Sequence, residues 1–388
     1  MENQSVNLAV VLDIKLDSGG AFHMSESQIF FLRKLKKKNK NINISLVATN
    51  KDLFFFLKKK YNFNIYYYKK NFFVIRLLNF FYKKISKFFT LNSHFEFFLK
   101  KRNINLVYFC SPSYLVLLFK NLEFIYTVFD LIDKKLEKLS EHNQPTVNLR
   151  HKCYKHAALY AKKIFITNNQ RKKIFIKNYN CFSKKIFTIQ FPPSVCLNRL
   201  ESKKVKINFA DKTIDTYIFY PAQYWSHKNH SYVIKSMIKF RSNKLKKLGC
   251  IFTGHDKGQL SYLKEYAKKI GINKKIIFYN YLSNNQLVYL YKHCFCVLFP
   301  SLIGFDSFPL YEAFYFKKMI IYNKNIIDKL FIKNIIPLNV SKNYDLEKKI
   351  LFLKKNNRIF KKILIKNNKL YKKNFSQLQI QFNNLIVN

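Results

Sequence analysis

The residues with the clearest chemical meaning lie in the segment PSLIGFDSFPLYEA, from Pro300 to Ala313. It follows directly on an apolar run, 295–299, that has the length and composition of a buried strand. Ser307 can cap a helix, and Pro309 suits a first helical turn, where its missing N–H would have no partner anyway. The segment therefore predicts a helix N-terminus just beyond a strand, with free backbone N–H groups that suit a diphosphate.

Glu312 stands one turn into that predicted helix. Its carboxylate can accept hydrogen bonds from the vicinal hydroxyls of a ribose placed just beyond the phosphate, as the acidic residue of dinucleotide-binding folds does. The alternative is that Glu312 only complements the dipole of its own helix, a contribution of about 0.3–1 kcal/mol. With the preceding loop present, the ribose role is the stronger interpretation.

A second candidate segment, YPAQYWSHKNH, runs from Tyr220 to His230 and follows another expected strand. Lys228 would lie near the start of the next helix, at the same edge of the sheet. A cation there can neutralise a departing diphosphate, and no metal-binding motif is evident that would do so instead. A solvated surface lysine is the ordinary alternative in a chain with 71 Lys and Arg residues. The only Trp and two His in the same segment favour the functional interpretation.

The elements that position these residues follow from the pattern of apolar runs. Val6 to Lys15 reads as a buried strand, followed by a Ser18-Gly19-Gly20 turn and helical apolar spacing over 25–37. A strand, a glycine turn and a helix in this order can bind a phosphate group at the turn. Short apolar runs at 43–48, 106–110, 124–128 and 163–167 alternate with longer helical stretches, whereas 53–98 is irregularly aromatic and basic. The alternation is typical of a parallel, doubly wound sheet.

The alternation breaks at Phe191-Pro192-Pro193 and the polar stretch 200–212, then begins again. Strands are expected at 217–220, 249–253, 275–279, 295–299, 319–322 and 335–338, and 346–388 reads as helical. We therefore predict an α/β protein with two Rossmann-like domains and a helical tail. The expected bounds are 1–200 and 201–365 for the domains and 366–388 for the last helix, a candidate to pack back on the first domain.

Composition excludes several classes of protein. A disordered chain would lack the 41 Phe and 26 Tyr found here, and 7 Gly and 8 Pro exclude a collagen-like chain. The seven Cys include no CxxC pair, so neither a disulfide framework nor a zinc ribbon is expected and a reducing compartment fits. We find no signal-peptide pattern and no run of about 18 apolar residues, so no membrane-spanning helix is expected.

The formal net charge of +50 has three interpretations. Basic runs interleaved with aromatic residues, as at 66–70 and 80–84, would suit the phosphates and bases of nucleic acid. However, Lys, Asn, Ile, Phe and Tyr are over-used along the whole chain, as an AT-rich genome would produce, and surface Lys costs little. A solvated surface is therefore the leading interpretation, an anionic membrane surface the second and specific nucleic-acid binding the third.

Both candidate segments resemble the retaining glycosyltransferases of family 4 (group 1), which have the GT-B fold of two Rossmann-like domains facing across a cleft. The resemblance is to a subgroup with motifs close to YPAQFWxHKNH and PxxxGPxxxPxxEA, and it extends weakly over most of the chain. Gly19 to His23 is similar to that subgroup's glycine loop, and Thr127 to Leu131 to its (W/H)D segment.

The resemblance implies that the second domain holds a nucleotide-sugar donor. Lys228 would contact the diphosphate and share the catalytic role with Asp130, and Glu312 would bind the ribose. The other implied donor-binding residues are Gly19, Gly20, Gln223, Leu282 near the base, and Gly304, Phe305, Asp306 and Ser307 near the sugar and phosphate. Neither a metal nor a cofactor is expected, since the nucleotide-sugar is a substrate.

The resemblance also implies transfer with retention at the anomeric carbon, through an oxocarbenium-like transition state, with the acceptor attacking on the side from which the nucleotide leaves. The leading hypothesis is thus a cytoplasmic glycosyltransferase that acts on a surface polysaccharide or lipid-linked glycan. The basic aromatic stretch 69–101 is a candidate contact with an anionic inner membrane surface.

Two alternatives stay open. The first is a basic α/β nucleic-acid-binding protein, although no specific nucleic acid is expected as a partner. The second is a catalytically inactive, transferase-like protein. It arises because Gln223 and Gly304 stand where many family members carry Arg and Glu, and Phe129 stands where His is common.

Overall fold

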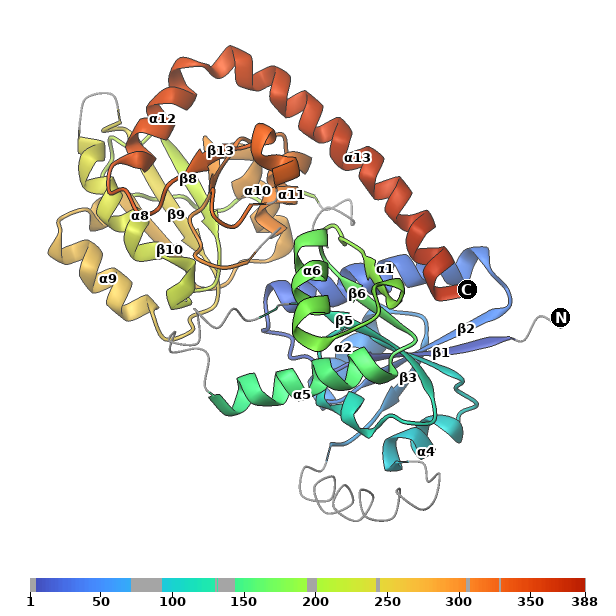
Figure 1. Ribbon diagram of the computed structural model, residues 1–388. Helices are drawn as coiled ribbons and strands as arrows, with labels where there is room; N and C mark the ends of the chain where they lie inside the picture. The colour runs from blue at the N-terminus through green and yellow to red at the C-terminus, as the bar shows by residue number, and fades with distance from the viewer. Residues whose placement is uncertain are drawn as a thin grey trace. The chain divides into compact units, whose positions relative to one another are not determined.

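The computed structural model describes residues 5–70, 93–129, 131, 144–193, 201–241, 245–304, 308–327 and 329–387. These residues form two units, each built around one parallel β-sheet (Figure 1). Unit 1 comprises Met1–Lys138, His142–Phe191 and Leu378–Asn388, and unit 2 comprises Leu139–Glu141 and Pro192–Gln377. The two sheets confirm the α/β class expected from the alternating pattern.

The described part of unit 1 holds a seven-stranded sheet in the order β3-β2-β1-β4-β5-β6-β7, with every neighbouring pair parallel. Its strands are β1 (Val6–Leu12), β2 (Ile42–Ala48), β3 (Asn64–Tyr67), β4 (Leu106–Phe109), β5 (Glu123–Val128), β6 (Lys163–Ile166) and β7 (Ile186–Thr188). Most residues of β1 and β2 are buried, as expected for a parallel sheet covered on both faces. Five of the strands confirm the apolar runs of the sequence, and β3 and β7 were not expected.

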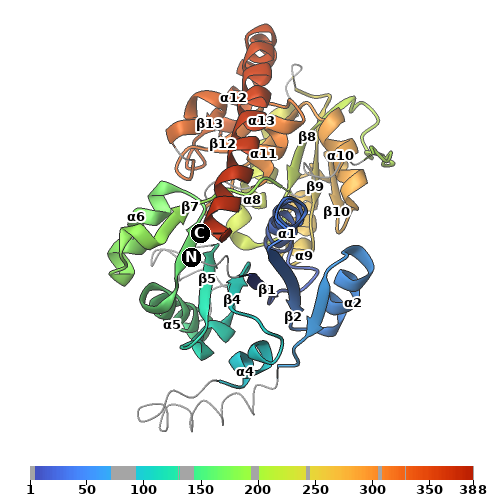
Figure 2. The ribbon, with the colours of Figure 1, turned by 90° about the vertical axis from the view of Figure 1, so that its right-hand side faces the viewer.

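The helices of unit 1 are α1 (Gly20–Lys38), α2 (Lys51–Lys60), α4 (His94–Lys100), α5 (Gln144–Tyr160) and α6 (Asn169–Tyr179), with the 3₁₀ turns η1 (Tyr114–Leu118) and η3 (Ser183–Lys185). In Figure 2, α1 and α2 lie beside β1 and β2, and α5 lies beside β5. The last residues of the chain complete this unit. Phe382 packs with its ring centroid 5.3 Å from that of Phe191, 5.9 Å from Phe31 and 6.0 Å from Phe165.

Unit 2 contains a six-stranded parallel sheet among its described residues, in the order β10-β9-β8-β11-β12-β13. Its strands are β8 (Thr216–Pro221), β9 (Leu248–Thr253), β10 (Ile276–Tyr279), β11 (Cys296–Phe299), β12 (Ile320–Asn323) and β13 (Ile336–Leu338). All six strands confirm the sequence expectation to within one residue at either end. The helical elements are η4 (Ser226–Lys228), α8 (His230–Ser236), η5 (Met237–Arg241), α9 (Leu260–Lys269), η6 (Asn273–Lys275), α10 (Asn284–His293), α11 (Phe308–Tyr315), η7 (Lys329–Asn334), α12 (Asp345–Lys355) and α13 (Asn357–Val387), whose last residues belong to unit 1.

The described residues contain neither a candidate membrane span nor a candidate metal site. None of their helices is long and apolar enough to cross a membrane. No group of three His, Cys, Asp or Glu side chains among them could hold a metal ion. The six cysteines within the described ranges are all buried and free of disulfides.

Candidate functional site

The two segments with candidate chemistry leave neighbouring strands of unit 2. β8 and β11 are paired in parallel, with Ile218 beside Cys296 and Phe219 beside Val297. The strand order reverses between them, because β9 lies on the other side of β8 and β12 on the other side of β11. Ligands of open α/β sheets bind at such a reversal, outside the carboxyl ends of the strands. The topology thus places both segments where a ligand is expected.

Hydrogen bonds connect the loop after β8 with the loop after β11. The backbone N–H of Leu302 donates to the carbonyl of His227 at 2.8 Å, and Ser301 Oγ lies 3.2 Å from the same carbonyl oxygen. The side-chain amide of Asn229 donates to the carbonyl of Pro300 at 3.3 Å. The two loops therefore form one connected edge of unit 2.

Lys228 lies against Gly304 at this edge. Its Nζ is 3.8 Å from the position that a β-carbon would take at Gly304, and 5.2 Å from the ring centroid of Phe299. Its backbone carbonyl accepts a 2.6 Å hydrogen bond from the hydroxyl of Tyr220. Gly304 has φ +102°, a conformation that residues with a side chain rarely adopt. The structure thus brings together two residues that lie far apart in the sequence and that we expected near the diphosphate and sugar.

Side chains of β12 fix the loop that contains Gly304. The hydroxyl of Tyr322 donates to the carbonyl of Gly304 at 3.1 Å, and the side-chain amide of Asn323 donates to the carbonyl of Ser301 at 2.8 Å. Ser301 Oγ also lies 2.6 Å from the carbonyl oxygen of Ile303. The main-chain conformation of 301–304 is therefore determined by contacts within unit 2.

Glu312 is a buried residue in the middle of α11. Its carboxylate accepts a hydrogen bond from the hydroxyl of Tyr291, which belongs to α10. Tyr291 is itself fully buried, with its ring stacked on Phe316 at a centroid distance of 5.1 Å and edge-on to Phe219 at 4.9 Å. The sequence interpretation missed Tyr291, because it lies in an apolar helical pattern that suggests only core packing.

His230 follows the loop of Lys228 in the chain and packs among aromatic side chains. It begins α8 and is buried between aromatic rings, 4.6 Å from the centroid of Tyr220 and 5.1 Å from those of Tyr224 and Phe252. Burial, together with the positive charge of Lys228, lowers the pKa of this imidazole to about 3. His230 is therefore neutral at pH 7 and adds no second cation beside Lys228.

The remaining donor-binding candidates of unit 2 lie in nearby loops. Gln223, in the loop after β8, accepts a 3.1 Å hydrogen bond from the indole N–H of Trp225. Leu282 is buried in the loop between β10 and α10.

Gly19 and Gly20 differ in what they require of the backbone. Gly19 caps the N-terminus of α1 with φ 58° and ψ −123°, a conformation that favours glycine. Gly20 is the first residue of α1, and a β-carbon there would meet nothing within 4 Å. Both glycines lie in unit 1. Four candidates lie outside the described residues, namely Asp130, Phe305, Asp306 and Ser307.

A polar cluster at the carboxyl end of the unit 1 sheet was also missed. Asp13, directly after β1, accepts hydrogen bonds from Ser113 Oγ at 2.6 Å and Thr49 Oγ1 at 2.7 Å, and it forms an ion pair with Lys70. The N–H of Asp13 donates to Ser111 Oγ at 3.2 Å. A usable signal existed, since Asp13, Thr49 and Ser111 stand among the first polar residues after three buried strands.

Comparison with known proteins connects this geometry to a family. Residues 202–371 match the model of the family described as Glycosyl transferases group 1. This segment includes Lys228, Gly304 and Glu312. A comparison with the curated proteins gives no match.

Several solved structures have the same fold over nearly the whole chain. HepE of Anabaena, solved in complex with UDP and glucose, has a TM-score of 0.71 at 11% identity, with 98% of this chain and 99% of that chain covered. A glycosyltransferase from Rickettsia africae ESF-5 has a TM-score of 0.66 at 17% identity, with 98% and 97% covered. WaaG, a glycosyltransferase involved in lipopolysaccharide biosynthesis, has a TM-score of 0.67 at 11% identity, with 98% and 99% covered.

These likenesses show the fold, and the two parallel sheets are the GT-B architecture expected from the sequence. The family match covers the part of the chain in which the candidate donor site lies. The chain therefore has the GT-B fold, and its residues 202–371 are similar to a group 1 glycosyltransferase domain.

Proposed function

We propose that this protein transfers a sugar from a nucleotide-sugar donor to a glycan or lipid-linked acceptor, with retention at the anomeric carbon. The observation that carries the proposal is the position of Lys228 Nζ beside Gly304, at the strand-order reversal of unit 2. A cation and a main-chain loop at that edge suit a diphosphate. The complexes of HepE with UDP and with UDP-glucose make uridine diphosphate sugars the first donors to test.

Lys228 would act on the departing diphosphate. Breaking the bond between the anomeric carbon and the diphosphate leaves negative charge on the phosphate oxygens. A fixed ammonium group stabilises that charge more in the transition state than in the bound donor. Because His230 is neutral, it does not compete with Lys228 for the anion. The remaining catalytic role, assigned to Asp130, rests on the sequence resemblance.

Glu312 would hold the ribose. Its carboxylate accepts the hydrogen bond from Tyr291, and carboxylate oxygens are the acceptors that bind the vicinal hydroxyls of a ribose in dinucleotide-binding folds. Tyr291 limits the rotamers available to Glu312 and so fixes its oxygen atoms before the donor arrives. Donor binding would then need no reorientation of this side chain.

The wider assignment belongs to the same proposal. A role in cell-surface polysaccharide synthesis and a peripheral position at the cytoplasmic side of the membrane are supported by the sequence resemblance and by the basic aromatic stretch 69–101. Of that stretch, 71–92 lies outside the described residues.

The experiment measures thermal stability of the full chain with UDP-, GDP-, ADP- and CDP-sugars. A donor at 100 times its dissociation constant adds about 2.7 kcal/mol of stability. We expect stabilisation by one nucleotide class, a smaller effect in Lys228→Ala, and a product with the anomeric configuration of the donor by NMR. Absence of stabilisation by every nucleotide-sugar would contradict the proposal, and an inverted product would contradict retention alone.

A further inference from the structure

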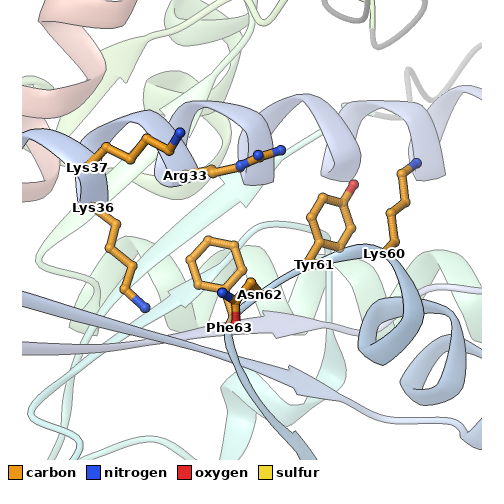
Figure 3. A pocket seen from close by; sticks show the side chains of 7 residues that line it. All are labelled: Arg33, Lys36, Lys37, Lys60, Tyr61, Asn62 and Phe63. Carbon is orange, nitrogen blue, oxygen red and sulfur yellow. The ribbon is translucent and has the colours of Figure 1, made fainter.

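A basic pocket lies in unit 1, among residues that the proposed donor site does not use. Its volume is about 580 Å³, within the range of small-molecule sites. Its lining consists of Arg33, Lys36 and Lys37 of α1, Lys60 at the end of α2, and Tyr61, Asn62 and Phe63, which lead into β3. Figure 3 shows the aromatic rings of Tyr61 and Phe63 facing α1, with the basic side chains around them. Cations from two helices thus surround one cavity.

One of these cations is already neutralised. Lys60 forms an ion pair with the buried carboxylate of Glu26, which also lies 3.3 Å from His23 Nδ1. Burial alone would raise the pKa of Glu26, but the contact with His23 and the charge of Lys60 hold the pKa below its ordinary value. Glu26 is therefore ionised, and its charge compensates that of Lys60.

The positive charge of Arg33, Lys36 and Lys37 is larger than the negative charge that the nearby helix ends supply. Lys36 and Lys37 stand in the last turn of α1, and Lys60 in the last turn of α2, where cations complement the helix dipole. Each helix end supplies about half a negative charge. Within the described ranges, Arg33, Lys36 and Lys37 form no ion pair. An excess of about two positive charges therefore remains around the cavity.

The wall of the pocket also offers neutral donors. Burial, reinforced by the charge of Glu26, raises the pKa of Tyr61, so its hydroxyl keeps its proton at neutral pH. Asn62 contributes a side-chain amide that is exposed to solvent. Lys36 Nζ lies 5.2 Å from the ring centroid of Phe63, and this cation–π contact stabilises the ammonium group at the pocket.

We propose that this pocket binds the phosphate group of a phosphorylated ligand, with Arg33, Lys36 and Lys37 as charged contacts and Tyr61 and Asn62 as neutral donors. A phosphate monoester carries about 1.5 to 2 negative charges at pH 7, which matches the excess in the pocket. The guanidinium of Arg33 can bind two phosphate oxygens at once. A cavity with charges of one sign also concentrates the field more than a flat basic surface does. This is what distinguishes the pocket from the many solvated lysines of the chain.

The phosphate can belong to a soluble metabolite or to a lipid headgroup, and the test separates the two sources. The soluble arm titrates inorganic pyrophosphate into the full chain at physiological salt, in a Lys228→Ala background that weakens the proposed donor site. The membrane arm measures sedimentation with phosphatidylcholine vesicles, with and without phosphatidic acid.

The test variant is Arg33→Gln/Lys36→Gln/Lys37→Gln. Its control, Lys264→Gln/Lys268→Gln/Lys269→Gln, removes the same net charge from exposed positions of α9. We expect at least tenfold weaker binding in the test variant and less than twofold change in the control. A pocket-dependent loss with pyrophosphate identifies a soluble ligand, and a loss with phosphatidic acid alone identifies a headgroup.

Equal losses in test and control variants would overturn the proposal, because binding would then follow net charge alone. So would pyrophosphate and vesicle binding that the test variant leaves unchanged. Tyr61→Phe, which removes one neutral donor and no charge, should weaken binding by a smaller factor. Melting temperatures of all variants establish that each is folded.

Discussion

The hydroxyl of Tyr291 donates a hydrogen bond to the carboxylate of Glu312, and both side chains are buried in unit 2. The contact joins α10 to α11, the helix that follows the loop of Gly304. It means that the side chain we assign to the ribose is held by a residue that would not itself touch the nucleotide. If Glu312 binds the ribose, as we propose, Tyr291 is a positioning residue whose role can be separated from that of Glu312.

Tyr291→Phe keeps the ring packing and removes only the donor. A hydrogen bond to a charged group contributes about 1.5–3 kcal/mol. If positioning is its role, we expect KM for the nucleotide-sugar to rise about tenfold, a cost of about 1.4 kcal/mol, with kcat changed less. Steady-state kinetics and calorimetry with the nucleoside diphosphate measure both. An unchanged nucleotide affinity would leave Tyr291 as a residue of the core alone.

Lys228→Ala removes the ammonium beside Gly304. Loss of one fixed donor to a developing anion typically costs about 10²–10³ in rate. We expect kcat to fall on that scale, with a melting temperature close to that of the parent, since the half-buried side chain contributes little to the core. Lys268→Ala on α9 is the control for loss of one positive charge. A rate within threefold of the parent would remove Lys228 from the mechanism.

Gly304→Ala and Gly20→Ala form a matched pair. Gly304 has φ +102°, so a β-carbon there strains the backbone and enters van der Waals contact with Lys228 Nζ. We expect about 1 kcal/mol or more of destabilisation together with reduced activity. Gly20 lies in α1 with open space around it, and alanine there should be neutral or stabilise by up to about 1 kcal/mol. Chemical denaturation of both variants measures the two changes in stability. Similar losses of stability in the two variants would contradict the prediction.

His230 makes stability depend on pH on the acid side. Its pKa is about 3 in the folded protein against an ordinary value of 6.5, so between these values the unfolded chain binds a proton that the folded chain does not. Above pH 6.5 both states are neutral and the contribution is zero. Below it, the free energy of unfolding should fall by about 1.4 kcal/mol per pH unit from this residue.

The comparison is with His230→Phe, which retains an aromatic ring between Tyr220 and Tyr224. The difference in free energy of unfolding between variant and parent should grow in favour of the variant as pH falls from 6.5 to 4.5. Parallel pH profiles of the two proteins would show that His230 is protonated in the fold.

A second buried carboxylate, that of Glu96 in unit 1, is expected to contribute to stability. Its Oε1 accepts the backbone N–H groups of Lys120, Asn121 and Leu122 at 2.8–3.1 Å, and its Oε2 accepts that of Ser93 at 3.0 Å. An unsatisfied buried donor costs about 1–3 kcal/mol, so Glu96→Ala should destabilise by about 3 kcal/mol or more.

Glu123→Ala is the control for Glu96→Ala, because Glu123 pairs with Lys162 in an exposed ion pair worth at most about 1 kcal/mol. Denaturant midpoints at constant m-value measure both changes. Equal effects would show that the four N–H groups find other acceptors when the carboxylate is lost.

Much of the fold could be predicted because buried parallel strands produce continuous apolar runs. β8 and β11 show this, and their loops could be assigned to one edge of the sheet without any contact information. β3 and β7 could not be found in this way. Both are short strands at the two edges of the unit 1 sheet, and their residues are only partly buried, so they leave no such run.

The candidate site could be predicted only as far as strand ends determine it. The proximity of Lys228 and Gly304 followed from the topology, whereas the contact of Tyr291 with Glu312 depends on how two helices pack. No spacing in the sequence encodes that packing. The Asp13 cluster, in contrast, joins residues that follow the ends of β1, β2 and β4, so strand ends could have indicated it. The roles of Asp130, Phe305, Asp306 and Ser307 stay predictions.

The hydrogen bonds from Tyr322 and Asn323 to the loop 301–304 have a thermodynamic consequence for ligand capture. This loop loses its conformational freedom when the chain folds, and not when a nucleotide arrives. Preorganisation of that kind spares the complex the entropic penalty of freezing those four residues, which for an unstructured segment would be about 1–2 kcal/mol per residue. Affinity at this edge should accordingly follow the charge and shape of the ligand, with little contribution from loop closure.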